Sequence, residues 1–119
     1  QNAKTNYDTM KLMYRLKIRG YKLALLSNTG GQSHIRVYKK LWFLYMDHKI
    51  MSSYIRMAKP GKSIYLYALK RLKAKPHECV FIDDLKENVS AARKVGINAI
   101  HFRNAAQVRS DLIKLGAKL

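Results

Sequence analysis

The stretch Val80-Phe81-Ile82-Asp83-Asp84-Leu85-Lys86-Glu87-Asn88-Val89 decides the fold class of this chain. Its first part, together with Cys79, is a short apolar run of the kind that forms a buried strand. Two adjacent aspartates, Asp83 and Asp84, follow directly, and apolar residues then recur at helical spacing as far as Gly96. Because ligand-binding side chains of open parallel sheets gather at the carboxyl ends of the strands, this order indicates an α/β fold with a site at the aspartates.

The same alternation extends on both sides of this stretch. Upstream, the patterns predict a helix at Tyr7–Lys17, a strand at Lys22–Leu26, a helix from about Ser33 to Phe43, a weak strand at Lys49–Ser52 and a helix at Ile64–Leu72. Downstream, they predict a strand at Asn98–Phe102 and a final helix at Val108–Leu115. Alternating strands and helices favour a parallel sheet with right-handed crossovers. We therefore expect one α/β domain over residues 1–119, with a Rossmann-like parallel sheet and flanking helices.

Composition limits the class of protein. The chain has 119 residues with 24 Lys+Arg and 7 Asp+Glu, a net charge of +17, and its 48% hydrophobic content is that of a packed domain. The longest uncharged stretches, Leu23–Ile35 and Leu41–Met46, are shorter than the ~20 apolar residues that span a bilayer, so no membrane helix is expected. The single cysteine, Cys79, fits a reducing compartment, and we expect a cytoplasmic location. The segment Gln1–Asn6 has neither an initiator Met nor a secretory signal, which indicates a truncated or processed start.

The charge distribution leaves two interpretations open. A large positive excess favours a polyanionic partner, because neutralising phosphates drives non-specific nucleic-acid binding. However, the basic residues are spread along the chain and never run beyond a pair. The carboxylates do cluster: four of the seven lie within ten residues, namely Glu78, Asp83, Asp84 and Glu87. The excess reflects either a surface for nucleic acid or another polyanion, or a generally basic proteome or an acidic segment outside this chain.

Three polar clusters are expected at the carboxyl edge of the sheet: Ser27-Asn28-Thr29, Lys59 and Asp83-Asp84. A hydroxyl, an ammonium and a carboxylate pair can hold a phosphate and a hard cation such as Mg²⁺. Taken singly, Ser-Asn-Thr is also a common turn and Lys59 is one of many surface cations. Adjacent carboxylates repel each other unless a cation or hydrogen-bond donors hold them, so the Asp83-Asp84 pair points most directly to a function.

In order and spacing, Leu25–Thr29, Ala58–Pro60 and Val80–Ala92 resemble the second, third and fourth motifs of the haloacid dehalogenase superfamily, in its phosphatase branch. The resemblance implies that Ser27 binds the transferring phosphoryl group and that Asn28 supports its loop. It also implies that Lys59 stabilises charge on the nucleophile and on the phosphoryl group. The Ser-Asn-Thr form with a later His34 is most similar to the sugar-phosphate phosphatases, although His34 fits a plain helix position equally well.

The same resemblance assigns the acidic cluster. Asp84 would be the Mg²⁺ ligand and Asp83 would reinforce the metal site, while Asn88 would hold the loop from the first turn of its helix. The implied protein is a Mg²⁺-dependent phosphatase that acts on small phosphorylated metabolites. Dehalogenation of small acids is the rival reaction, and the paired carboxylates oppose it because that branch needs no metal.

One motif of the superfamily is not found. Its nucleophile is the first Asp of an Asp-x-Asp motif, which forms an aspartyl-phosphate, but no two acids of this chain are separated by a single residue. The resemblance therefore implies the C-terminal part of a haloacid dehalogenase-like core, an incomplete sheet that lacks the first strand and the cap and is inactive alone. Departures from the family pattern at Arg56, Lys62 and Leu85 keep open the alternative of a catalytically inactive basic domain that binds nucleic acid or another polyanion.

The missing strand has a structural consequence. In the resembled fold it lies between the strand at Leu23–Leu26 and the strand at Val80–Ile82, so both would keep an unpaired backbone edge. Unpaired edges invite pairing with another chain. We expect this chain either to associate with itself or to pair with a segment that supplies the strand.

Overall fold

The computed structural model describes residues 3–27, 45–51 and 61–119. The elements are α1 (Ala3–Ile18), β1 (Ala24–Ser27), β2 (His48–Met51), α4 (Lys62–Leu72), the 3-10 turn η2 (Pro76–Glu78), β3 (Val80–Asp83), α5 (Lys86–Lys94), β4 (Asn98–His101) and α6 (Ala105–Lys114). This order confirms the predicted α/β fold. The helix expected from about Ser33 to Phe43 lies outside the described residues. No helix in the described ranges is long and apolar enough to cross a membrane.

The strands form two separate parallel pairs. β1 pairs with β2 from Ala24 opposite His48 to Ser27 opposite Met51. β3 pairs with β4 from Val80 opposite Asn98 to Asp83 opposite His101. Within the part of the chain that the structure describes, β1 and β3 do not pair with each other, and each has one strand partner.

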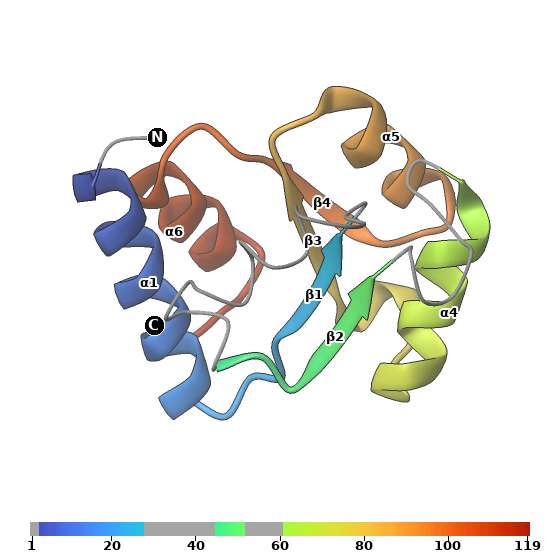
Figure 1. Cartoon of the computed structure of the whole chain (residues 1–119), viewed down its shortest axis with the longest axis horizontal. Helices are drawn as coiled ribbons and strands as arrows, with labels where there is room; N and C mark the ends of the chain where they lie inside the picture. The colour runs from blue at the N-terminus through green and yellow to red at the C-terminus, as the bar shows by residue number, and fades with distance from the viewer. Residues whose placement is uncertain (1–2, 28–44, 52–60) are drawn as a thin grey trace.

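Helices join the two strand pairs. Figure 1 shows α1 and α6 on one side of the strands and α4 and α5 on the other. The core beneath α4 and α5 contains Ile50 of β2 together with Tyr65 of α4, and Phe81 of β3 packs against it. The core beneath α1 and α6 joins Leu12 of α1 to Ile100 of β4. Burial of apolar side chains in these two layers therefore holds the strand pairs in one domain.

The cover over β3 is uneven. Phe81 faces the α4 side, where its ring meets the Tyr65 ring edge-on at a centroid distance of 5.2 Å and an angle of 83°. Side chains alternate along a strand, so Val80 and Ile82 face the other way, and they are 36% and 37% exposed. Ile100, which lies opposite Ile82 in β4, is only 4% exposed and packs beneath α6. The helical cover thus buries β4 on this face and leaves β3 partly open.

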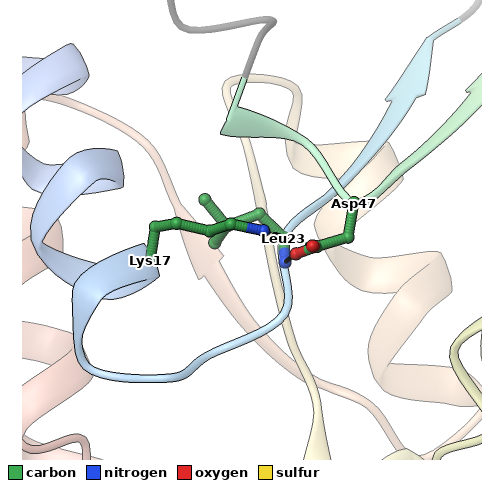
Figure 2. A network of polar contacts seen from close by, with 3 residues as sticks. All are labelled: Lys17, Leu23 and Asp47. Carbon is green, nitrogen blue, oxygen red and sulfur yellow. Dashed lines mark hydrogen bonds and ion pairs between the residues drawn. The ribbon is translucent and has the colours of Figure 1, made fainter.

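Asp47 fixes the start of the β1–β2 pair. Its carboxylate pairs with the Lys17 ammonium of α1 and accepts a hydrogen bond from the Leu23 backbone N–H at 2.8 Å, as Figure 2 shows. In return, the Asp47 N–H donates to the Leu23 carbonyl at 2.7 Å. The next residues along, Ala24 and His48, are the first pair of the parallel register. One carboxylate therefore links the end of α1 to the register of both strands.

The Asp47→Asn variant tests this link. It removes the charge but keeps an oxygen for the Leu23 N–H, and we expect the free energy of unfolding to fall by about 0.5–1 kcal/mol, the range of a partly exposed ion pair. The Lys17 ammonium, followed by the Leu23 N–H, holds the pKa of Asp47 below its ordinary value of 3.8. A lowered pKa in the folded state stabilises the fold above the unfolded pKa, and this contribution is lost as the pH falls through the folded pKa.

Asp8→Asn is the matched control, because Asp8 lies on α1 and makes no ion pair within the described residues. Denaturant unfolding of both variants between pH 2 and pH 7 measures the difference. Equal stabilities of the two variants across this range would show that Asp47 has no such role.

Candidate functional site

The turn after β3 is closed by the carboxylate of Asp83. Its Oδ1 accepts a hydrogen bond from the Leu85 N–H at 2.8 Å, and its Oδ2 accepts one from Asn88 Nδ2 at 3.2 Å. The Asp83 carbonyl also accepts from the Phe102 N–H at 2.8 Å, which extends the ladder between the two strands. An aspartate that bonds to its own chain a few residues on is a common way to fix a turn. The connection from β3 to α5 is therefore held from within.

Asn88 is itself held by the opposite helix. It is 2% exposed, and its carbonyl accepts a hydrogen bond from the Tyr65 hydroxyl of α4 at 3.1 Å. Burial, together with the nearby charge of Asp83, raises the pKa of Tyr65 to about 12. The hydroxyl is therefore protonated at neutral pH and acts as the donor. Through Tyr65, the packing of α4 fixes the first turn of α5 and, with it, the donor to Asp83.

Asp84 presents an exposed carboxylate at this turn. Its carbonyl lies 2.8 Å from Nε2 of His101 at the end of β4, so its backbone is bound to the neighbouring strand. Its side chain is exposed and has no hydrogen-bond or ion-pair partner within the described part of the chain. A fixed backbone with an available carboxylate at the carboxyl end of a strand is the arrangement expected of a ligand-binding residue.

The carboxylate oxygens of this turn fit part of a Mg²⁺ site. Mg²⁺ takes oxygen ligands and is usually held by one or two carboxylates, with water and phosphate oxygens completing its shell. Asp84 offers a free carboxylate, and Asp83 lies next to it with both oxygens already accepting hydrogen bonds. Within residues 3–27, 45–51 and 61–119 no three acidic, histidine or cysteine side chains gather as a metal cluster. These residues therefore suit the cation but need further oxygen ligands to hold it.

The other predicted site residues are only partly described. Ser27 is the last residue of β1, half-buried and at the carboxyl end of its strand, as the sequence predicts. Asn28, His34 and Lys59 lie outside the described residues. The expectation that Ser27, Lys59 and Asp84 share one pocket therefore stays a prediction.

Sequence reasoning missed the two residues that support the turn from other elements, Tyr65 and His101. Tyr65 lies in the apolar stripe of its helix, where an aromatic residue is read as core, and only its hydroxyl signals a polar partner. His101 ends a strand-like run, and the one sequence signal of its role is that a polar residue stands at the carboxyl end of that strand. Both contacts join segments far apart in the sequence.

The match to a family agrees with this geometry. The family model described as "Hydrolase: haloacid dehalogenase-like hydrolase" matches residues 2–96. The chain therefore belongs to the haloacid dehalogenase-like hydrolase family, and phosphatases among its relatives confirm the resemblance to the phosphatase branch.

Three similar proteins illustrate the relationship. Bifunctional epoxide hydrolase 2 of Mus musculus is 39% identical over 115 residues, which cover 92% of this chain and 21% of that protein. Glyceraldehyde 3-phosphate phosphatase of Pyrococcus furiosus is 29% identical over 107 residues, covering 86% of this chain and 43% of that protein. A solved HAD family enzyme of Bacteroides thetaiotaomicron, in complex with magnesium and inorganic phosphate, has a TM-score of 0.70 at 27% identity and covers 80% of this chain and 51% of that one. The chain thus spans about a fifth of the mouse protein and less than half of the archaeal one.

Replacing Asn88 tests how the turn is held. Asn88→Ala removes a buried donor to a carboxylate, and we expect a loss of about 1.5–3 kcal/mol in the free energy of unfolding, as for other hydrogen bonds to charged groups. Ser90→Ala, at an exposed position of the same helix, is the control and should change stability by less than about 0.5 kcal/mol. Chemical denaturation measures both variants. A stability of Asn88→Ala equal to that of wild type would mean that the turn does not depend on this contact.

Proposed function

We propose that this chain is the C-terminal part of a Mg²⁺-dependent phosphatase that hydrolyses small phosphomonoesters. The observation that carries the proposal is the hydrogen-bonded turn at Asp83, which leaves the Asp84 carboxylate exposed at the carboxyl end of β3. Membership of a hydrolase family and the likeness to an enzyme crystallised with magnesium and inorganic phosphate support it. These findings favour the phosphatase over the alternative of a basic domain that binds nucleic acid or another polyanion.

Residues of this chain would bind the cation and the phosphoryl group or support the residues that do. Asp84 would bind the cation and Asp83 would hold the turn and reinforce the metal site, with Asn88 as its support. Ser27 and Asn28 would donate hydrogen bonds to phosphoryl oxygens, and Lys59 would offset their negative charge. A bound Mg²⁺ would add charge stabilisation at the same oxygens.

The nucleophile would come from outside these 119 residues. The sequence contains no Asp-x-Asp motif, so the chain has no candidate for the attacking carboxylate of the family. Two features of β3 support a place for the strand that would carry it: β3 has one described strand partner, and Val80 and Ile82 are more than one third exposed. A strand beside β3 would pair its backbone edge and add apolar cover. Because that strand would also carry the nucleophile, the chain alone would be inactive.

Complementation tests this proposal. The chain is mixed with a fragment that carries an Asp-x-Asp strand, and hydrolysis of p-nitrophenyl phosphate is followed with the melting temperature. We expect the melting temperature to rise on mixing, because a partner that binds only the folded state stabilises it, and we expect Mg²⁺-dependent turnover to appear.

A fragment with Asn in place of its first Asp is the matched control. It should give the same rise in melting temperature without turnover, since packing needs the strand whereas the reaction needs the carboxylate. Phosphatase activity of the chain alone, or a melting temperature that does not change on mixing, would contradict the proposal.

Metal affinity gives a second test. Asp84 is the carboxylate of the turn that accepts no hydrogen bond from the described residues, so we expect Mg²⁺ alone to bind more weakly than micromolar and inorganic phosphate to tighten its binding. Asp84→Asn should abolish this binding. Glu87→Gln, which makes the same charge change on an exposed residue three positions along, should retain it. Calorimetric titration that shows micromolar Mg²⁺ affinity without phosphate, or equal effects of the two variants, would refute this assignment.

A further inference from the structure

The peptide group between Asp84 and Leu85 is held at both of its ends. Its N–H, which belongs to Leu85, donates to Asp83 Oδ1 at 2.8 Å. Its C=O, which belongs to Asp84, faces His101 Nε2 at 2.8 Å. A carbonyl oxygen only accepts, so Nε2 of His101 carries the hydrogen and donates it. A peptide group is planar, and two hydrogen bonds on opposite sides fix its rotation.

His101 is well placed to act as the anchor for the carbonyl. It lies opposite Asp83, and these two residues form the last pair of the β3–β4 register. Its own carbonyl accepts a hydrogen bond from Gln107 Nε2 of α6 at 3.1 Å. Gln107 in turn is fixed by the capping box at Asn104, whose side chain accepts from the Gln107 N–H at 2.8 Å. The histidine is thus tied to the N-terminus of α6 as well as to β4.

The orientation of this peptide group fixes the backbone on the C-terminal side of the Asp84 Cα, and with it the frame from which the side chain projects. The carboxylate of Asp83 bonds to Leu85 and to Asn88, and within the described residues His101 is the side chain that hydrogen-bonds to Asp84 itself. If the carbonyl were released, the bond of the Leu85 N–H to Asp83 would be the one hydrogen bond of this peptide left within the described residues, and the backbone that carries the Asp84 carboxylate would be held less firmly. A metal ligand held in one direction binds its ion more tightly, because less conformational entropy is lost on binding.

We propose that His101 is a positioning residue for Asp84: by holding the Asp84 carbonyl, it aims the carboxylate at the cation site. The inference rests on the proposed role of Asp84 as metal ligand. His101 does not touch the cation; it acts through the backbone of its neighbour across the strand ladder.

A pair of variants separates the hydrogen bond from the bulk of the side chain. His101→Leu removes the donor, whereas His101→Gln keeps an amide N–H at a similar reach to Nε2. The full chain is titrated with Mn²⁺ as the probe, the free ion is followed by electron paramagnetic resonance, and the melting temperature of each variant is recorded. His77→Leu, at an exposed histidine of η2, is the control for loss of an imidazole.

We expect His101→Leu to weaken Mn²⁺ binding about tenfold, the low end of the effect seen when residues that support a metal ligand are removed. His101→Gln should recover most of this affinity, and His77→Leu should equal wild type. Mn²⁺ binding to folded His101→Leu with wild-type affinity would overturn the inference, as would a folded His101→Gln as weak as the leucine variant. If His101→Leu does not fold, the glutamine variant decides alone: near-wild-type affinity supports the donor role, and a tenfold loss overturns it.

Asp84→Asn distinguishes this failure from failure of the proposed function. If Asp84→Asn leaves Mn²⁺ binding unchanged, Asp84 is not the ligand. The proposed metal site and the inference about His101 would then both be refuted. If Asp84→Asn abolishes Mn²⁺ binding and His101→Leu leaves it unchanged, Asp84 keeps its role as ligand and only the proposed role of His101 is refuted.

Discussion

The carboxylate of Asp83 is the group on which the candidate site depends. By accepting hydrogen bonds from the Leu85 N–H and from Asn88, it converts the end of a strand and the start of a helix into one rigid turn. Two neighbouring carboxylates at a strand end would otherwise repel each other. The donors offset this cost on one member of the pair and leave the other, Asp84, exposed for a ligand. The two aspartates therefore have different tasks because their hydrogen-bond environments differ.

The elements around this turn are stabilised mainly by helix packing. Because β1–β2 and β3–β4 are separate pairs within the described residues, the apolar layers beneath α4 and α5, and beneath α1 and α6, connect them. Tyr65 links this packing to the site, since its ring contacts Phe81 in the core and its hydroxyl holds Asn88. Loss of packing beneath α4 would therefore reach the site through the Tyr65 side chain.

Much of the fold could be predicted from the sequence. The helical spacing of Ile64, Ala68 and Leu72 and the apolar run before Asp83 gave elements that the structure shows within a few residues at each end. Asp83 and Asp84 stood out because acids are rare in this chain and gather there.

The supporting contacts could not be predicted in the same way. The bond from Tyr65 to Asn88 spans 23 residues and the one from His101 to Asp84 spans 17, so each depends on how packed elements meet. The ion pair of Lys17 with Asp47 spans 30 residues, and nothing in the local pattern of either residue signals it. Local periodicity specifies elements, whereas the partners of a polar side chain follow from tertiary packing.

The central claim is that Asp84 binds the cation while Asp83 holds the turn. A crystal structure of the chain with Mn²⁺ and inorganic phosphate, with the ion located by its anomalous scattering, tests this most directly. The account predicts a metal ion bonded to an Asp84 carboxylate oxygen at about 2.0–2.3 Å, with Asp83 still accepting from Leu85 and Asn88. A metal ion bound by Asp83 in place of these donors, or bound away from the turn, would contradict it.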